Sequence, residues 1–412
     1  MAAERGRAAV TDGAKRGLAA IPRGVWVLGA VSLCMDTSSE LVHSLLPLYL
    51  AVGLGASTLA IGVIEGVAEA TALVVKVFSG VLSDAFRRRK PLLVAGYGLA
   101  AVTKLVFPLA PSFAWVVGAR FADRVGKGIR GAPRDALLAD LTPQDVRGAS
   151  FGLRQTLDTV GAVGGPLLAI VAMAAFAGDF RTAFWVAVVP AFLAVALLVG
   201  GISEPARGGA AAEGGKPALG LAAVKRLGRS YAIVVAIAAV LTLARFSEAF
   251  LVLRARDAGL SLGESPWVMV VMSLVFSLSA YPAGAAADRG HGPKLLSAGL
   301  LALVLADLVL ANAASGSIVL AGAGLWGLHM GLTQGLLAAL VAAAAPEDLR
   351  GTAFGVYNLV CGLALLAASA LAGWLWDAFG PAVTFYAGAA FTVVAWVGFL
   401  RHGRKAAELT RA

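Results

Sequence analysis

A ten-residue phrase occurs twice in this chain, half a chain apart. Residues 143–152 read Pro-Gln-Asp-Val-Arg-Gly-Ala-Ser-Phe-Gly, and residues 346–355 read Pro-Glu-Asp-Leu-Arg-Gly-Thr-Ala-Phe-Gly. Six of the ten positions are identical, at an offset of 203 in a chain of 412 residues. Because each copy joins one long apolar segment to the next, the repetition predicts a duplicated membrane bundle with two equivalent halves.

The composition indicates a chain that is solvated by lipid. Hydrophobic residues make up 59% of the sequence and charged residues 14%, with a mean hydropathy of +0.83. A soluble domain carries about 25% charge, and a helix needs about 20 mostly apolar residues to span a bilayer. Twelve spans are expected, near residues 24–50, 57–82, 91–110, 113–140, 149–175, 183–202, 231–254, 266–287, 294–314, 317–344, 353–376 and 381–400. The ten-residue apolar–polar alternation of a membrane barrel is not found.

The expected fold is an all-α membrane protein whose twelve transmembrane helices form two pseudo-symmetric six-helix bundles. Residues 203–230 are rich in Gly, Ala and Pro and are typical of a flexible linker. The predicted parts are therefore an N-terminal tail (1–23), a first bundle (24–202), the linker (203–230), a second bundle (231–400) and a C-terminal tail (401–412).

Two shorter echoes support the duplication. Residues 80–84 and 284–288 share a Gly-x-x-x-Asp pattern, and Ser39-Glu40 is repeated as Ser247-Glu248. Both pairs keep nearly the same offset as the long phrase, which is hard to obtain by chance.

Basic residues fall where the predicted spans would meet one side of the membrane. The net charge is +10, and Lys and Arg gather in both tails, in the turn at 87–90 and in the linker. The turns after the first, third and ninth spans contain neither residue. The positive-inside rule then places both termini in the cytoplasm, and we expect a bacterial inner membrane. Nucleic-acid binding is not favoured, because the charge is divided among short segments.

Several kinds of chemistry are not indicated by the sequence. Cys34 and Cys361 both lie in apolar spans, so we expect neither a disulfide nor a metal site, and no cofactor. No Gly-x-x-x-x-Gly-Lys-Ser/Thr loop is present, so ATP is not the expected energy source. Before residue 24 no short apolar core ends at a cleavage site, which predicts that the first span is an uncleaved insertion signal.

The turn between the second and third spans carries a family resemblance. It reads Gly80-x-x-x-Asp84-x-x-Arg-Arg-Arg-Lys90 and resembles the signature loop of the major facilitator superfamily, from which it departs at Ala85 and Arg87. The resemblance extends over nearly the whole chain. It implies two six-helix bundles that rock around a central site lined by helices one, four, seven and ten.

Two further patterns belong to the same resemblance. Gly161-x-x-x-Gly165-Pro166 in the fifth span resembles the start of the family's antiporter motif, although the trailing Gly-Gly is missing. In the fourth span either Arg120 or Arg124 matches the family's buried arginine. The spacing to Pro133 favours Arg120, and the spacing to Gly128 favours Arg124.

Ionisable side chains are dense in the predicted spans. Asp36, Glu40 and His43 share one face of the first span, and Glu65 and Glu69 share one face of the second. An unpaired charge deep in a span costs about 2.5–3.5 kcal/mol or more, so these faces should meet protein or water.

The carboxylates have two possible roles. A carboxyl that titrates near neutral pH can take up a proton on one side of the membrane and release it on the other. Alternatively, each carboxylate neutralises an arginine or lysine of a neighbouring helix. The candidates for proton coupling are Asp36, Glu40, Glu65, Glu69 and Asp158.

The fourth span carries a stripe of cations that also has two explanations. Arginine forks bind carboxylate or phosphate, so Arg120 and Arg124 are candidates for substrate or coupling roles. Lys127, Arg130 and Arg134 lie nearer the cytoplasmic end, where we favour a structural role at the gate.

Further candidates for the substrate cavity come from both halves: His43, Arg245, Glu248, His329 and Gln334. Arg245 and Glu248 lie one helical turn apart in the seventh span, so a self-contained ion pair is the alternative for them. His43 is as well explained by packing as by the cavity.

A cytoplasmic gate is expected at the two Gly-x-x-x-Asp turns. Glycine permits a tight helix end, and the aspartate can hold basic side chains when this side is shut. The predicted gate residues are Gly80, Asp84, Arg88, Arg89, Gly284, Asp288 and Arg289. The alternative is that the basic residues act only as a topology signal.

Together these patterns predict a secondary transporter, not an enzyme, that moves a small solute by alternating access as a monomer. We expect proton-coupled efflux by antiport. An importer or anion exchanger that uses the helix-four arginines is the alternative, and a membrane-embedded sensor or enzyme is a remote one.

Overall fold

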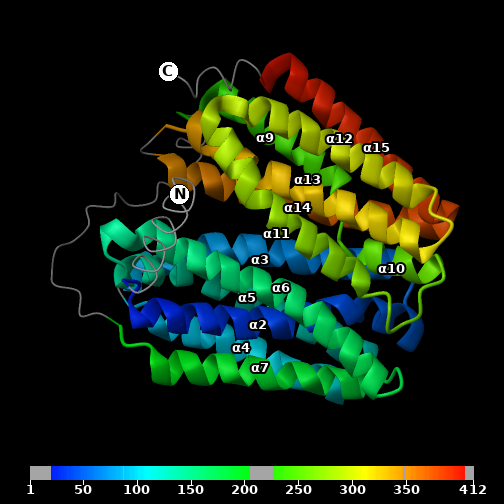
Figure 1. Cartoon of the computed structure of the whole chain (residues 1–412), viewed down its shortest axis with the longest axis horizontal. Helices are drawn as coiled ribbons and strands as arrows, with labels where there is room; N and C mark the ends of the chain where they lie inside the picture. Colours follow the sequence, from blue (N-terminus) through cyan, green and yellow to red (C-terminus); the bar gives the residue numbers. More distant parts are fainter. Residues whose placement is uncertain (1–19, 87, 205–225, 347–348, 404–412) are drawn as a thin grey trace, which may run out of the picture.

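The computed structural model describes residues 20–86, 88–204, 226–346 and 349–403, and all regular secondary structure in these ranges is helical (Figure 1). The elements are α2 (Arg23–Leu48), η1 (Tyr49–Gly53), α3 (Thr58–Phe86), α4 (Lys90–Leu109), α5 (Phe113–Leu141), η2 (Gln144–Val146), α6 (Arg147–Ala175), α7 (Phe180–Gly201), α9 (Gly228–Ala244), α10 (Ala249–Asp257), α11 (Trp267–Ala286), η3 (Ala287–His291), α12 (Gly292–Ala311), α13 (Gly316–Ala344), α14 (Arg350–Phe379), α15 (Pro381–Gly398) and η5 (Phe399–Gly403).

The helices have the lengths that a bilayer requires. Within the described residues, eleven helical segments are long and apolar enough to cross a membrane, with α9 and α10 counted together as Gly228–Asp257. The remaining long helix, α5, spans 29 residues but carries the cationic stripe, which lowers its hydropathy. The chain is therefore a multi-pass membrane protein, and the expected all-α fold with membrane-length helices is confirmed.

Figure 1 shows two groups of helices. Helices α2 to α7 pack mainly on one another, and so do α9 to α15. We call them the first and second bundles. Helix α2 packs on α6 and α7, α5 packs on α3 and α4, and in the second bundle α13 packs on α11 and α12.

The repeated phrase occupies equivalent places in the two bundles. The first copy connects α5 to α6, and the second connects α13 to α14. Helix α6 begins at Arg147 and α14 begins at Arg350, the same position of the phrase. Prolines in the first turn begin α4, α12 and α15, where a missing amide hydrogen is tolerated.

The two ends of the bundle are named by the connections that they carry. The terminal side is where α2 begins, where α6 and α14 begin, and where α15 ends. The opposite side carries the short connections after η1, α4, α6, α10, α12 and α14. Most helices simply alternate in direction between these sides.

The bundles meet mainly through α3 against α14 and through α6 against α11. Small residues permit the close approach of α3 and α14. A Cβ atom at Gly62 would lie 2.1 Å from the Ser369 carbonyl oxygen, and one at Gly373 would lie 2.4 Å from the Thr58 carbonyl oxygen. Glycine is therefore required on both helices, as in closely packed membrane helices generally.

A carboxylate also joins the bundles at the opposite side. Asp377, near the end of α14, accepts hydrogen bonds from the backbone amides of Thr58 (3.1 Å) and Leu59 (2.8 Å) at the start of α3. The Thr58 hydroxyl donates to the same carboxylate. Asp377 therefore caps the first turn of a helix in the other bundle, where orphan amides and the helix dipole favour an anion.

Candidate functional site

The centre of the first bundle holds two ion pairs between α3 and α5. The Arg120 guanidinium binds both carboxylate oxygens of Glu65, with Nε–Oε1 at 3.0 Å and Nη2–Oε2 at 2.5 Å. One turn further, Arg124 Nη1 lies 3.0 Å from Glu69 Oε1. The Arg120, Arg124 and Glu65 side chains are at most 1% exposed, whereas Glu69 is 25% exposed. The two glutamates are four residues apart on α3, and the two arginines are four residues apart on α5. Each helix therefore presents its two charges on one face, and the two faces meet.

A third acid extends this network to α4. Asp123 accepts a hydrogen bond from Lys104 Nζ at 2.8 Å and lies 3.1 Å from Arg124 Nη2. Lys104 and Asp123 are both fully buried. Lys104 therefore neutralises Asp123 inside a closed ion-pair network.

Two carboxylates of α2 face the same network and remain partly exposed. Glu40 Oε2 lies 3.4 Å from His43 Nδ1, while His43 Nε2 lies 3.8 Å from Glu65 Oε2. His43 therefore links a carboxylate of α2 to one of α3. Asp36 is held loosely, with Arg130 Nη2 at 3.9 Å. Asp36 and Glu40 are 24% and 20% exposed.

The glycines of the fifth span pack directly against these carboxylates. A Cβ at Gly161 would lie 3.0 Å from the Asp36 Cβ, and one at Gly165 would lie 2.7 Å from the Glu40 Cβ. Both would also approach the α2 backbone at 2.9 Å or less. The antiporter-like motif therefore lets α6 approach α2 where the two partly exposed acids lie.

Asp158 belongs to a separate cluster nearer the terminal side. Its Oδ2 lies 2.9 Å from Arg154 Nη1 on the same helix and 3.7 Å from Arg134 Nη2 on α5. Arg154 and Arg134 also contact Asp135, each at 3.4 Å. The cluster connects α5 and α6 through shared carboxylates.

The protein does not fully close the space between α2, α3 and α5. Lys127 is an exposed residue of α5, yet it lies within electrostatic range of Asp36, Glu40 and Glu69 on the other two helices. Lys127 and these three partly exposed acids are therefore not sealed off by other parts of the protein.

The second bundle offers fewer charges, and they lie at a break in the seventh span. Helix α9 ends at Ala244 and α10 begins at Ala249, and Arg245 has a non-helical backbone (φ −103°, ψ 59°). The sequence predicted one continuous helix here, with Arg245 and Glu248 one turn apart. That expectation is wrong, because Arg245 leaves the helical conformation and the residues up to Glu248 belong to neither helix.

Glu248, the last residue of the break, nevertheless lies near the centre. Glu248 lies within electrostatic range of His43, Glu40 and Glu69 of the first bundle. No ion pair joins Arg245 to Glu248 in the described part of the chain, so the self-contained pair does not form. The site is therefore shared between the bundles.

The two candidates on α13 differ in their surroundings. His329 is fully buried, and its Nδ1 lies 2.8 Å from the Gly299 carbonyl oxygen of α12. Since a carbonyl oxygen only accepts, Nδ1 carries the proton and donates it. Gln334 is half-buried. The cavity roles of His329 and Gln334 stay predictions.

The predicted gate is only partly described. The side chains of Asp84 and Asp288 lie outside the described residues, so their proposed role stays a prediction. Arg89 is buried and pairs with Asp140 of α5 at 2.8 Å, while Arg88 and Arg289 are exposed. Gly80 lies in α3, and Gly284 lies in α11.

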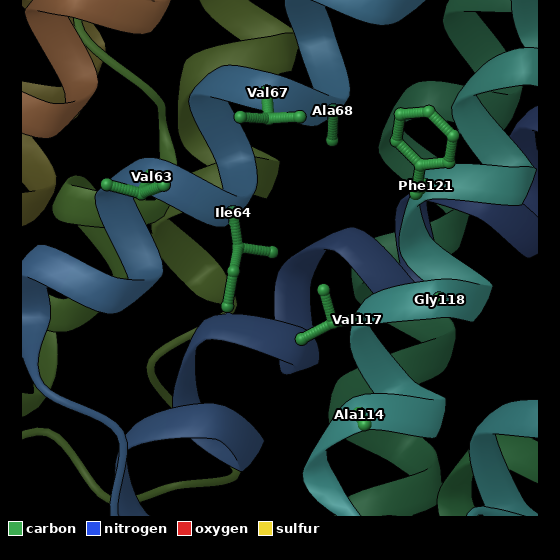
Figure 2. A pocket seen from close by; sticks show the side chains of 8 residues that line it. All are labelled: Val63, Ile64, Val67, Ala68, Ala114, Val117, Gly118 and Phe121. Carbon is green, nitrogen blue, oxygen red and sulfur yellow. The ribbon is translucent and has the colours of Figure 1, made fainter.

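An apolar crevice of 410 Å³ lies between α3 and α5 (Figure 2). Its lining residues are Val63, Ile64, Val67 and Ala68 of α3 and Ala114, Val117, Gly118 and Phe121 of α5. Because this lining has no polar side chain, the crevice suits an acyl chain or another apolar group and is not the charged site.

Some residues that matter here were not predicted. Asp377 was not singled out, since a lone aspartate at the end of an apolar span shows no partner in the sequence. Arg254 of α10 was missed as well, and it donates to the carbonyl oxygens of Leu310 (2.9 Å) and Ala313 (2.6 Å). Among the described residues, no three His, Cys, Asp or Glu side chains gather to form a metal site.

Two helical bundles that share a charged, solvent-reached centre define a membrane carrier. The sequence profile of the Major Facilitator Superfamily matches residues 28–369 and, in a second match, residues 235–411. The chain therefore belongs to the major facilitator superfamily, and it is a transporter with a secondary-transporter fold, not an enzyme. The resemblance read from the sequence is confirmed.

The relatives that this chain resembles include transporters from distant organisms. It is 28% identical over 380 residues to an uncharacterized MFS-type transporter of Methanocaldococcus jannaschii, covering 91% of this chain and 93% of the relative. It is 31% identical over 370 residues to an uncharacterized protein of Mycobacterium bovis, covering 89% of each. It is 26% identical over 383 residues to the inner membrane transport protein YajR of Escherichia coli, covering 90% and 81%.

Solved structures show the same fold at low identity. The nucleoside transporter NupG is 13% identical with a TM-score of 0.75, covering 92% of this chain and 99% of that one. A D-xylose–proton symporter is 17% identical with a TM-score of 0.67, covering 91% and 95%.

Proposed function

We propose that this protein is a proton-coupled exporter that moves a small solute across a bacterial inner membrane by alternating access, with both termini in the cytoplasm. The observation that carries the proposal is the pair of partly exposed carboxylates on α2. Asp36 and Glu40 lie beside fully buried ion pairs, but each keeps about a fifth to a quarter of its side chain exposed.

The geometry around Glu40 supports a coupling role. His43 lies between Glu40 and the buried Glu65, which is held by Arg120. A proton that arrives at Glu40 weakens its attraction for His43, which can then turn toward Glu65. Such a change is transmitted from a solvent-reached acid to the α3–α5 ion pairs, and α3 forms much of the contact with the second bundle.

Two observations support a structure that opens to the terminal side. Lys127 is exposed, whereas at the opposite side the bundles are joined by Asp377 and by the packing of Gly373 on Thr58. With the termini in the cytoplasm, as the basic residues favour, this arrangement would receive solute and release protons on the cytoplasmic side. Export by antiport also agrees with the Gly161–Gly165 motif, which supports the contact between α6 and the carboxylates of α2.

The alternative that uses the arginines of the fourth span receives less support. Arg120 and Arg124 are 1% exposed and each is bound to a glutamate. A substrate anion would have to displace a well-placed carboxylate from either arginine.

The proposal is tested with purified protein in proteoliposomes. A thermal-shift screen at two pH values first identifies a bound solute, and an imposed pH gradient then drives its uptake into vesicles. We expect wild type to concentrate the solute, whereas Glu40→Gln and Asp36→Asn exchange it without concentrating it, since a neutral amide carries no proton. Glu264→Gln, in the connection before α11, is the matched control. Uphill transport that persists in both α2 variants would disprove coupling on this helix.

A further inference from the structure

The break in the seventh span is fixed by contacts from other helices. The Ser247 backbone amide donates to the Ser369 hydroxyl of α14 at 3.1 Å, and the Ser247 hydroxyl accepts from the Ala249 amide at 3.3 Å. The Phe246 ring packs at 5.5 Å from the rings of Phe250 and Trp326. The break is thus held open by specific contacts, and backbone irregularity at membrane depth is tolerated where it lines a polar site.

Arg245 occupies the first position of this break and is unlike the other basic residues of the spans. Among the described lysines and arginines that are buried or half-buried, it alone has neither an ion pair nor a hydrogen bond of its side chain. Its Nε is fully buried and has no hydrogen-bond partner. Every other such cation has a carboxylate or carbonyl partner. A guanidinium without a counter-ion in a span is costly, which indicates that the partner is supplied from outside the chain.

The groups around Arg245 suit an anion. Arg245 lies within electrostatic range of Tyr357 and Cys361 of α14, and of Glu248 across the break. Tyr357 is half-buried and its hydroxyl can donate a hydrogen bond. Glu248 also lies near His43, Glu40 and Glu69 of the first bundle, and no ion pair joins it to Arg245 among the described residues.

The same arrangement explains why Glu248 does not neutralise Arg245. On a continuous helix a residue pair at i and i+3 would meet. The break between α9 and α10, which begins at the non-helical Arg245, removes that geometry. The break therefore separates two opposite charges that a regular helix would join, and both become available to a ligand in the centre.

We propose that Arg245 binds an anionic group, carboxylate or phosphate, of the transported solute. This rests on the proposed transport function and adds to it the chemical class of the substrate. The planar guanidinium can take such a group through two parallel hydrogen bonds. The anion would lie at the break on the α14 side, and the rest of the solute would extend toward Glu248 and the first bundle.

The test uses thermal unfolding of the purified full-length protein in detergent at constant ionic strength. The probes are inorganic phosphate, acetate, succinate and citrate, with choline and mannitol as the cationic and neutral controls. We expect at least one of the four anions to stabilise the wild-type protein, with choline and mannitol inactive. Arg245→Gln should weaken the apparent affinity for that anion about tenfold or more, and Arg245→Lys should retain part of it. The organic and inorganic probes distinguish a carboxylate solute from free phosphate.

Two comparisons keep the test decisive. Arg256→Gln removes an exposed arginine of α10 and should leave anion binding unchanged. Without ligand, Arg245→Gln should unfold at the wild-type temperature or above it, because an unpaired, half-buried charge is removed. A structural role for Arg245 would instead make this variant less stable.

Three results would overturn the proposal: no anion that stabilises the wild type, an anion shift that survives in Arg245→Gln, or equal loss in Arg256→Gln. Failure of proton coupling is a separate outcome. In that case Glu40→Gln would transport like wild type, while the anion shift and its dependence on Arg245 would remain.

Discussion

The two bundles share a fold and a repeated phrase, yet they hold their ionisable side chains differently. In the spans of the first bundle, each described carboxylate that is buried or half-buried has a lysine, an arginine or, for Glu40, a histidine within 4.0 Å. In the second bundle Arg245, Glu248 and Asp307 have neither an ion pair nor a side-chain hydrogen bond among the described residues. The two bundles therefore share a backbone plan but differ in how their charges are paired.

The difference separates two uses of charge inside a membrane. Arg120 and Glu65 neutralise each other in a site that excludes water, so they hold α3 and α5 in register. Arg245 and Glu248 are half-buried and unpaired, so they can respond to a ligand. Removing one partner of a buried ion pair destabilises the protein, whereas removing an unpaired charge can stabilise it. The difference can be measured as a change in the free energy of unfolding.

The largest expected effect is in the first bundle. Arg120→Leu leaves Glu65 buried without its partner and should lower the free energy of unfolding by about 3–5 kcal/mol. The double variant Arg120→Leu/Glu65→Leu should regain much of this loss, because neither charge remains. Unfolding by SDS in mixed micelles measures both. Arg256→Leu, at an exposed position, is the control, and additive losses in the double variant would contradict the pairing.

A smaller effect of opposite sign is expected in the second bundle. Asp307 is fully buried in α12, and neither of its carboxylate oxygens has a hydrogen-bond partner. Asp307→Leu should therefore raise the free energy of unfolding by about 1–3 kcal/mol. The matched substitution Asp123→Leu removes a paired aspartate and should destabilise the protein. If Asp307→Leu also destabilises it, the contrast between the bundles fails at this position.

The smallest effect concerns the contact between the bundles. The Thr58 and Leu59 backbone amides donate to different oxygens of the Asp377 carboxylate. In Asp377→Asn one of these oxygens becomes an NH2 group, so one hydrogen bond and about 1 kcal/mol of capping energy are lost. A cysteine at Met173, buried on α6 near the opposite side, should then react with an impermeant maleimide roughly fivefold faster.

Asp179→Asn is the control for this measurement. Asp179 caps α7 within one bundle by accepting from the Arg181 and Thr182 amides, each at 3.2 Å. The hydrogen bond from the Thr182 hydroxyl holds the pKa of Asp179 below its ordinary value. Equal labelling rates in Asp377→Asn and wild type would show that the cap does not hold this side closed.

Much of the architecture could be predicted from local patterns. Runs of about 20 apolar residues predict spans without knowledge of their neighbours, and the helical repeat places Glu65 and Glu69 on one face. The duplicated phrase indicated equivalent connections, and the starts of α6 and α14 at Arg147 and Arg350 agree with it. The proposed linker falls largely on residues outside the described part, so it stays a prediction.

The partners of each charge could not be predicted in this way. Glu40, Glu65 and Glu69 were equal candidates in the sequence, but Glu65 is sealed by Arg120 while Glu40 keeps contact with solvent. The choice depends on how α2, α3 and α5 are rotated against one another. No local pattern records those rotations, because they arise from packing between helices.

The amino-acid sequence alone determined that the chain spans a membrane many times, that its halves are related, and which helices carry acids and bases. Those properties depend on side-chain hydrophobicity and on the period of a helix, which are local. The tertiary structure decided which charges cancel, where the seventh span breaks, and how Asp377 reaches α3. These depend on distances of a few ångströms between residues far apart in the chain, such as Ser247 and Ser369.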